Sequence, residues 1–202
     1  DKNLNIGIYE YIPGKKIKTP NSLDLNSFLN FIKKLKTISK NKKHLTKFSL
    51  ASETSTNLND LLKEINKRKK ILINEMDKKK YKTIIKDINI LWKYMKIHSL
   101  KTNKKSNLKD LILSPSDIGI HNAIKFKNKL YILDFEYFGL DDPIKITSDF
   151  IIHPANNFNY EQLNIWLNSM KKIFSDIDNF NEKFMIYFPY YLYRWILIIL
   201  KI

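Results

Sequence analysis

Cysteine is absent from the sequence of 202 residues. Its absence excludes a disulfide framework and any metal site built on thiolates. The four histidines are scattered along the chain, so they form no zinc-binding motif either. A chain without disulfides suits a reducing compartment, and we expect a cytoplasmic location.

Arginine is almost as scarce. Only two of the 36 basic residues are arginine, Arg68 and Arg194, although the formal net charge is +16. Nucleic-acid-binding surfaces favour arginine, because its planar guanidinium matches phosphates and base edges. Lysine, asparagine and isoleucine are over-used together, which is typical of an AT-rich genome. The charge is therefore a weak argument for a nucleic-acid partner, and a basic nucleic-acid-binding protein is the least favoured alternative.

Long apolar runs are also missing. Residues 184–202 are the most apolar stretch, but they contain Pro189, Arg194 and Lys201 and lack the charge-free run of about 18–20 residues that a membrane span requires. We expect a buried amphipathic helix there and no membrane span. The sequence begins with Asp1 rather than methionine, so we expect it to be part of a longer chain. It shows no signal peptide. Nothing in the pattern specifies an oligomeric state.

Apolar residues at helical spacing predict that most of the chain is helical. The predicted helices cover residues 25–38, 58–76, 81–95, 144–153, 160–175 and 182–201. Pro154 and Pro189 should break the helical pattern. Polar loops are expected over 40–57 and 101–109, and a strand over 4–12. The three tryptophans fall on apolar helical faces and are predicted to be core residues.

A different pattern occupies the centre of the chain. Two short β-like runs, 123–126 and 129–133, flank Lys127-Asn128 and predict a hairpin. The expected fold class is therefore α+β, with a mainly helical domain around a small central β-hairpin.

Polar residues gather on both sides of this hairpin. Asp117 and Asn122 precede it within Ser116-Asp117-Ile118-Gly119-Ile120-His121-Asn122, and Asp134-Phe135-Glu136 follows it. Carboxylate and amide oxygens at the mouth of a hairpin can hold a hard cation, and a further carboxylate can orient a hydroxyl group. Taken singly, each residue could instead be a turn or helix-cap residue. Their order along the chain favours a chemical role.

Asp117, the later Asn122, the hairpin and Asp134-Phe135-Glu136 together resemble the catalytic and metal-binding loops of protein-kinase-like phosphotransferases. Asp-Phe-Glu in place of Asp-Phe-Gly, with a later Asp142-Pro143, is similar to the aminoglycoside phosphotransferase/choline kinase family. The resemblance implies the large lobe of a protein-kinase-like fold. Residues 1–12 would be the end of the small lobe and the hinge, and residues 13–202 the helical C-terminal lobe. The implied function is an ATP-dependent phosphotransferase that acts on a small-molecule hydroxyl or amino acceptor.

The resemblance also implies roles for single residues. Asp117 would orient or deprotonate the acceptor. Asn122 and Asp134 would bind the Mg²⁺ that bridges the phosphates of ATP. Glu136 and Asp142 would position the acceptor or brace the loop.

The start of the chain would form part of the nucleotide site. Backbone groups of Glu10, Tyr11 and Ile12 would face the adenine. The family's Gly-rich loop and phosphate-binding lysine would lie before the first residue of this sequence. The family usually has a histidine two residues before the catalytic aspartate, where this chain has Pro115. We expect a rearranged loop there, and a catalytically inactive kinase-like binding module is the main alternative.

Two histidines lie near these motifs. His121 precedes Asn122 and could shuttle protons, but a packing or hydrogen-bonding role is favoured. His153 lies before Pro154 at the end of an apolar helix and is predicted to be structural.

Overall fold

The computed structural model describes residues 10–41, 45–99 and 110–201, and helices make up most of these ranges. In chain order the helices are α1 (Ser22–Ser39), α3 (Leu58–Glu75), α4 (Lys82–Ser99), α5 (Pro143–Ile152), α6 (Tyr160–Ile173) and α7 (Phe180–Ile199). The strands are β1 (Lys15–Lys16), β2 (Ile112–Ser114), β3 (Ala123–Phe126), β4 (Lys129–Ile132) and β5 (Gly139–Asp141). A short 3-10 helix, η2 (Ile120–Asn122), precedes β3. The predicted helices agree with the observed ones to within a few residues, and the predicted loop 101–109 lies outside the described residues.

The helix starts show why local sequence predicts them well. Asn21 caps α1 by accepting hydrogen bonds from the backbone N–H groups of Leu23 and Asp24, at 2.9 and 3.0 Å. The Asp24 carboxylate accepts from the Asn21 backbone in return, at 3.0 Å, which completes a capping box. Asn159 and Gln162 form the same arrangement at the start of α6.

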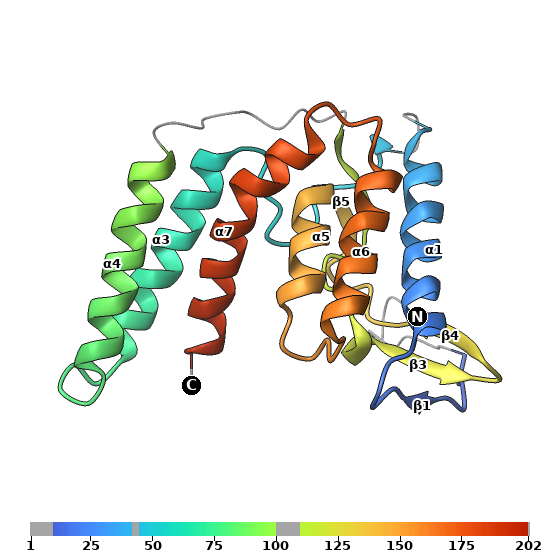
Figure 1. The fold of residues 1–202 in the computed structure, drawn as a ribbon, viewed down its shortest axis with the longest axis horizontal. Coiled ribbons are helices and arrows are strands. Elements are labelled where there is room, and N and C mark those ends of the chain that lie inside the picture. The colour runs from blue at the N-terminus through green and yellow to red at the C-terminus, as the bar shows by residue number, and fades with distance from the viewer. Residues whose placement is uncertain (1–9, 42–44, 100–109, 202) are drawn as a thin grey trace, which may run out of the picture.

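Two predictions about local structure need correction. Helix α7 continues through Pro189, so the predicted break there is wrong. The proline removes one backbone hydrogen bond, but Tyr187, Tyr190 and Leu197 on either side are buried, and this burial holds the helix together. Figure 1 shows α7 changing direction along its length. Residues 4–9 of the predicted N-terminal strand lie outside the described residues, and residues 10–12 are not in a strand.

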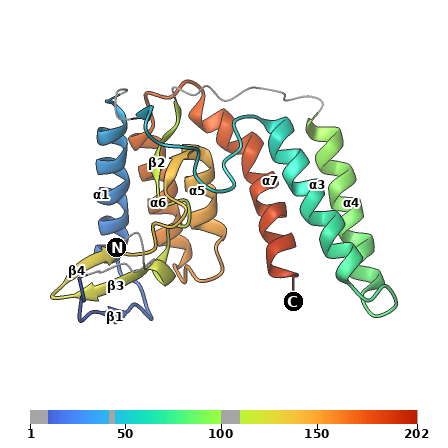
Figure 2. The same cartoon turned by 180° about the vertical axis from the view of Figure 1, so that it is seen from behind.

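The helices lie side by side, with α5 and α7 in the middle. Helix α5 packs against α7 and α6, and α7 packs against α3 and α4. Figure 1 shows α3 and α4 at one end of this row and α1 and α6 at the other. Seen from behind in Figure 2, β2 lies beside α1, which it contacts. Among the described residues, no helix is both long and apolar enough to cross a membrane.

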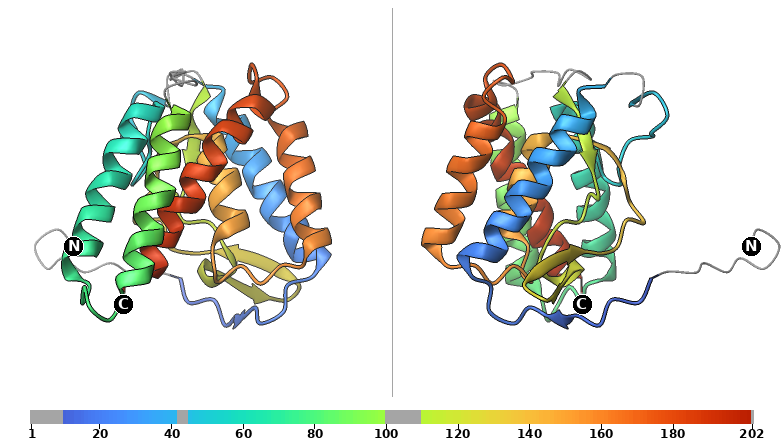
Figure 3. Two further views of the ribbon diagram at one scale, coloured as in Figure 1. Left: turned by 60° about the vertical axis from the view of Figure 1, so that its left-hand side comes forward. Right: turned by 90° about the vertical axis from the view of Figure 1, so that its right-hand side faces the viewer.

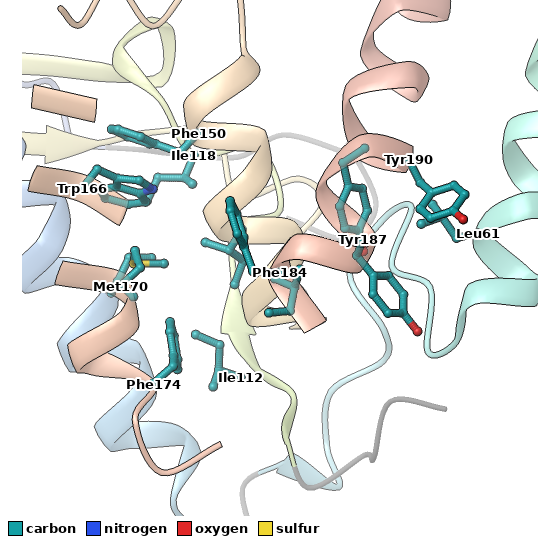
Figure 4. Close-up of a cluster of buried hydrophobic side chains, with 14 of the residues drawn as sticks. Leu61, Ile112, Ile118, Phe150, Trp166, Met170, Phe174, Phe184, Tyr187 and Tyr190 are labelled. Atoms are coloured by element: carbon teal, nitrogen blue, oxygen red, sulfur yellow. The ribbon is translucent and has the colours of Figure 1, made fainter. Parts of the chain in front are cut away.

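The core is aromatic around α5. Phe150 is fully buried, with its ring centroid 3.7 Å from that of Trp166 and 5.4 Å from that of Phe28. These contacts join α5 to α6 and α1. Figure 4 shows Phe150, Trp166 and Met170 on one side of the cluster and Tyr187 and Tyr190 on the other.

The predicted hairpin is present. Strands β3 and β4 pair antiparallel from Ala123↔Ile132 to Phe126↔Lys129. The turn residues Lys127 and Asn128 both have positive φ, 46° and 61°, as a two-residue type I′ turn requires. Strand β1 pairs with β3 to give a three-stranded sheet, which Figure 3 shows below the helices.

A second sheet, which was not predicted from the sequence, forms hydrogen bonds with the loop after α1. Strands β2 and β5 pair antiparallel and place Ser114 opposite Gly139. A Cβ atom at Gly139 would lie only 2.6 Å from both Ser49 O and Ala51 N. Glycine therefore lets residues 49–51 cross closely against β5, where Ala51 N donates to Leu140 O at 2.9 Å. This contact brings the following loop residues, 52–53, toward Asp117.

Candidate functional site

Asp117 lies in a tightly held turn between β2 and η2. Strand β2 is fully buried and ends at Ser114. Ser116, two residues later, has a left-handed φ of 68°. The Ser116 hydroxyl donates to Ser52 O at 2.9 Å and accepts from Lys145 Nζ at 3.0 Å. The Ser116 N–H donates to Ser114 Oγ at 2.9 Å. A local hydrogen bond and contacts to two distant segments, the loop at Ser52 and helix α5, thus fix the backbone that carries Asp117.

The two oxygens of the Asp117 carboxylate have different surroundings. Oδ2 accepts hydrogen bonds from His121 Nε2 at 3.1 Å and from Asn122 Nδ2 at 3.3 Å. Asn122 Nδ2 also donates to the backbone oxygen of Asp117 at 2.9 Å. Among the described residues, the ionisable neighbour of Oδ1 is His153, whose Nε2 lies 3.8 Å away. Oδ1 therefore has room for a further hydrogen-bonding partner, and the side chain is 43% exposed.

These neighbours keep Asp117 in its basic form. Burial alone would raise the pKa of Asp117, but the hydrogen bond and positive potential from His121, with smaller contributions from His153 and Asn122, outweigh burial. The pKa of Asp117 therefore lies below its ordinary value. At neutral pH the group is an oriented carboxylate with one oxygen left open, which suits a residue that accepts a proton.

Asp117, His121 and His153 bring three possible metal ligands within 4.8 Å of one another. Hydrogen bonding argues against a metal there. His153 Nδ1 accepts from the backbone N–H of Ala155 at 3.1 Å, so the ring proton is on Nε2, the atom that faces Asp117. His121 Nδ1 is buried and has no partner in the described part of the chain, whereas a metal-bound histidine normally donates that N–H to an oxygen. We interpret the cluster as a hydrogen-bonded group around Asp117.

Asn122 and Asp134 are brought to the same end of the hairpin. Leu133 N donates to Asn122 O at 2.8 Å, so the segments that carry the two side chains are joined directly. The Nδ2 group of Asn122 is held by Asp117, which leaves its carbonyl oxygen Oδ1 as the available donor atom. Asp134 is exposed and has a left-handed φ of 60°, two residues after the end of β4. An amide oxygen and a carboxylate are a donor set that fits Mg²⁺.

A pocket of about 240 Å³ adjoins Asp117. Helices α5 and α7 and the loops at 52–53 and 116–117 line it, with Tyr137 and Trp195 as aromatic wall residues. Trp195 was predicted to be a core residue, but it is only partly buried and lines this pocket. A slightly larger hollow, of about 290 Å³, is lined by α1 and α6 and is rich in lysine. We place the candidate site at the smaller pocket because Asp117 lies in its wall.

The floor of this pocket is a network of buried charges. Lys145 donates to Asp141 at 2.9 Å and lies 3.4 Å from Asp149. Arg194 Nη2 donates to both oxygens of Asp149, each at 2.8 Å, and Trp195 Nε1 donates to Asp149 Oδ1 at 2.8 Å. Although burial would raise the pKa of Asp149, Arg194 and Lys145 hold it below its ordinary value. Buried charges paired in this way fix α5 and α7 relative to each other and keep the pocket walls in place.

Sequence reasoning missed this network, although a signal for it was present. Arg68 and Arg194, the only arginines in the chain, both approach the carboxylate of Glu53. Glu53 lines the pocket and has a left-handed φ of 60°. In a chain that uses lysine almost everywhere, an arginine marks a position where a planar group with several N–H donors is needed.

The structure places the remaining predicted site residues as follows. Glu136 is exposed, two residues after Asp134. Asp142 is buried and caps the start of α5. Glu10 and Tyr11 are exposed and Ile12 is partly buried, in a segment without regular secondary structure. None of these five lines the pocket beside Asp117.

No protein-family model matches the chain, and no curated protein matches its sequence. Solved structures do match the chain, among them a phosphotransferase and a choline kinase. Spectinomycin phosphotransferase APH(9)-Ia, in complex with ADP and spectinomycin, matches with a TM-score of 0.61 and 12% identity, over 94% of this chain and 58% of that chain. Choline kinase from Cryptosporidium parvum Iowa II matches with a TM-score of 0.49 and 14% identity, over 95% of this chain and 63% of that chain.

The chain thus spans less than two thirds of the length of either protein. At this identity the first likeness establishes the fold, and it confirms the α+β class that the sequence predicted. The chain has the mainly helical part of the kinase-like fold found in an aminoglycoside-type phosphotransferase.

Proposed function

We propose that this chain is the large lobe of an ATP-dependent phosphotransferase that acts on a small-molecule hydroxyl or amino acceptor, in the cytoplasm. One observation carries the proposal. Asp117 lies on the rim of a pocket, with Oδ2 held by His121 and Asn122 and with Oδ1 open. The fold likeness to a spectinomycin phosphotransferase supports it. Residues 1–12 would then be the end of the small lobe and the hinge, and residues 13–202 the helical lobe.

The chemistry follows from the open oxygen. An acceptor in the pocket would direct its O–H or N–H toward Asp117 Oδ1. As the acceptor atom attacks the γ-phosphorus of ATP, its proton passes to Oδ1 and the bond to the bridging oxygen breaks, which releases ADP. Because Oδ2 already accepts hydrogen bonds from His121 and Asn122, the carboxylate does not have to reorient during the transfer.

Asn122 and Asp134 would hold the metal in this proposal. Bound Mg²⁺ would neutralise charge on the phosphate oxygens. The bond between Leu133 N and Asn122 O keeps the two ligand segments in register, so their oxygens can face one cation. Backbone groups of Glu10, Tyr11 and Ile12 would contact the adenine.

The test uses the full-length gene product, with any residues that precede Asp1. Mg²⁺-dependent ADP release from ATP is measured with a pooled panel of choline, spectinomycin, sugars and amino sugars. We expect acceptor-stimulated release that falls at least about 100-fold in both Asp117→Asn and Asp134→Asn. Only Asp134→Asn should also weaken Mg²⁺-ATP binding in calorimetry. Asp87→Asn on the exposed face of α4 is the matched control and should leave turnover unchanged. Turnover that survives both site substitutions contradicts the proposal.

The second candidate is a catalytically inactive kinase-like binding module. Pro115, at the position where the family usually has a histidine, favours it. This alternative predicts Mg²⁺-ATP binding that Asp134→Asn weakens, with no ADP release for any acceptor in the panel.

A further inference from the structure

His153 is held rigidly beside Asp117 from a distant part of the chain. It ends α5, and its ring stacks on that of His121, with centroids 4.1 Å apart and planes 5° from parallel. The ring of Trp195 meets it edge-on, at a centroid distance of 4.6 Å and an angle of 76°. Aromatic contacts on two sides therefore leave the imidazole little freedom to rotate.

The backbone fixes which nitrogen of His153 carries the proton. Ala155 N donates to Nδ1 at 3.1 Å, so Nδ1 is an acceptor and the neutral ring carries its proton on Nε2. Protonation of Nδ1 would set its N–H against the N–H of Ala155. Burial and the neighbouring His121 also lower the pKa of His153, although Asp117 and Asp149 act in the opposite direction. At neutral pH, His153 thus presents an Nε2–H donor to Asp117.

The distance between donor and carboxylate fits one atom between them. Nε2 of His153 and Oδ1 of Asp117 are 3.8 Å apart, too far for a direct hydrogen bond. One oxygen can lie about 2.7–2.9 Å from both atoms at once, which is the normal hydrogen-bond range. Such an oxygen would lie at the pocket wall, where both Asp117 and Trp195 are exposed to the pocket.

We propose that His153 Nε2–H donates a hydrogen bond to the acceptor oxygen while the acceptor proton points at Asp117 Oδ1, so that the two residues together select a hydroxyl group. This rests on the function proposed above. A hydroxyl group supplies one proton for Asp117 and a lone pair for His153, and its second lone pair attacks phosphorus. A protonated amine has no lone pair with which to attack phosphorus, and a neutral amine has only one, so an amine cannot attack and accept a hydrogen bond from His153 at the same time. The pair therefore favours transfer to oxygen over transfer to nitrogen.

One arm of the test compares acceptor chemistry on the full-length wild-type enzyme. The hydroxyl probes are glycerol, myo-inositol, glucose and choline, and the amine-only probes are putrescine and cyclohexylamine. We expect ADP release to be stimulated by hydroxyl-bearing compounds alone, with an acid-stable phosphate ester as the product in ³¹P NMR. Stimulation by an amine-only probe, or an acid-labile phosphoramidate product, overturns the inference and leaves the proposed function intact.

The other arm removes the donor. His153→Phe keeps a ring against His121 and Trp195 but has no N–H, and His153→Gln offers an N–H again. We expect His153→Phe to lower kcat/KM for the active hydroxyl probe about 10–100-fold with the KM for ATP unchanged, and His153→Gln to recover to within about 10-fold of wild type. His98→Phe, a histidine-to-phenylalanine change on α4, is the control and should match wild type.

The outcomes separate the two proposals. An active wild type whose His153→Phe variant keeps its full kcat/KM overturns the role of His153 alone. Equal losses in His153→Phe and His153→Gln also overturn it, because the donor then has no part in the effect. A wild type that binds no Mg²⁺-ATP and releases no ADP with any probe overturns the proposed function, and this inference with it.

Discussion

Asp142 provides a stringent test of the electrostatics around α5. Its carboxylate is almost fully buried and accepts a hydrogen bond from Ile144 N at 2.8 Å as the N-cap of the helix. Burial raises its pKa from 3.8 to about 6, against the lowering effect of that hydrogen bond. In Asp142→Asn the side-chain oxygen can still cap the helix, since asparagine and aspartate are similar N-cap residues, but the ionisable group is lost.

The expected change follows from the two pKa values. In the unfolded chain the group ionises near pH 3.8, and in the folded chain near pH 6. Between these values the unfolded state has released more protons, so the group lowers the stability of the wild type as the pH rises through this window. A shift of about two pKa units corresponds to about 3 kcal/mol. Asparagine does not ionise, so Asp142→Asn should gain up to about 3 kcal/mol relative to wild type between about pH 4 and about pH 7.

Urea unfolding followed by circular dichroism at several pH values measures this difference. Asp87→Asn, an exposed substitution with the same change of charge, is the control and should show no such gain. A difference between Asp142→Asn and wild type that stays constant from about pH 4 to about pH 7 would refute the reasoning, because no buried ionisation would then be lost.

Two further substitutions test the packing and the charges beneath the pocket. Gly139→Ala should lower the free energy of unfolding by about 1–3 kcal/mol, because its Cβ would lie 2.6 Å from backbone atoms of Ser49 and Ala51; a urea midpoint equal to that of wild type would show that the crossing loop yields. Asp149→Asn should lower it by about 3–5 kcal/mol near neutral pH, since Arg194 loses its buried counter-charge. The pKa of Asp149 is lowered in the folded state, so this loss should shrink as the pH falls below about 4; a loss that is the same at all pH values contradicts the ion-pair explanation.

Local sequence patterns were enough for the helices and the hairpin. Asn21 and Asn57 cap helices through side-chain hydrogen bonds within their own first turns, and Lys127-Asn128 forms a turn between adjacent strands. These features depend on residues only a few positions apart, so the sequence carries them directly. The break predicted at Pro189 failed for the opposite reason, because distant residues that bury both sides of α7 outweigh a local preference.

The residues of the candidate site also fall into two groups, those indicated by local sequence and those placed by the packing of distant segments. Asp117, Asn122 and Asp134 were proposed from their order around the hairpin, and the structure joins their segments through hydrogen bonds from Asn122 Nδ2 to Asp117 O and from Leu133 N to Asn122 O. His153 and Trp195 were predicted to be structural, and the structure places them beside Asp117 and in the pocket wall. His153 is the C-cap residue of α5 and Trp195 lies within α7, and the apolar spacing of these helices does not indicate the polar contacts that the two side chains make.

The sequence alone thus determined the helices, the hairpin and the likeness of the central motif, because these depend on spacing and turn chemistry within short stretches. Only the tertiary structure decided that α5 and α7 bring His153, Asp149 and Arg194 to the loop of Asp117. It also decided, through the backbone of Ala155, which nitrogen of His153 faces that loop. Contacts of this kind are set by the packing of whole helices against one buried aromatic core, and no local pattern specifies their geometry.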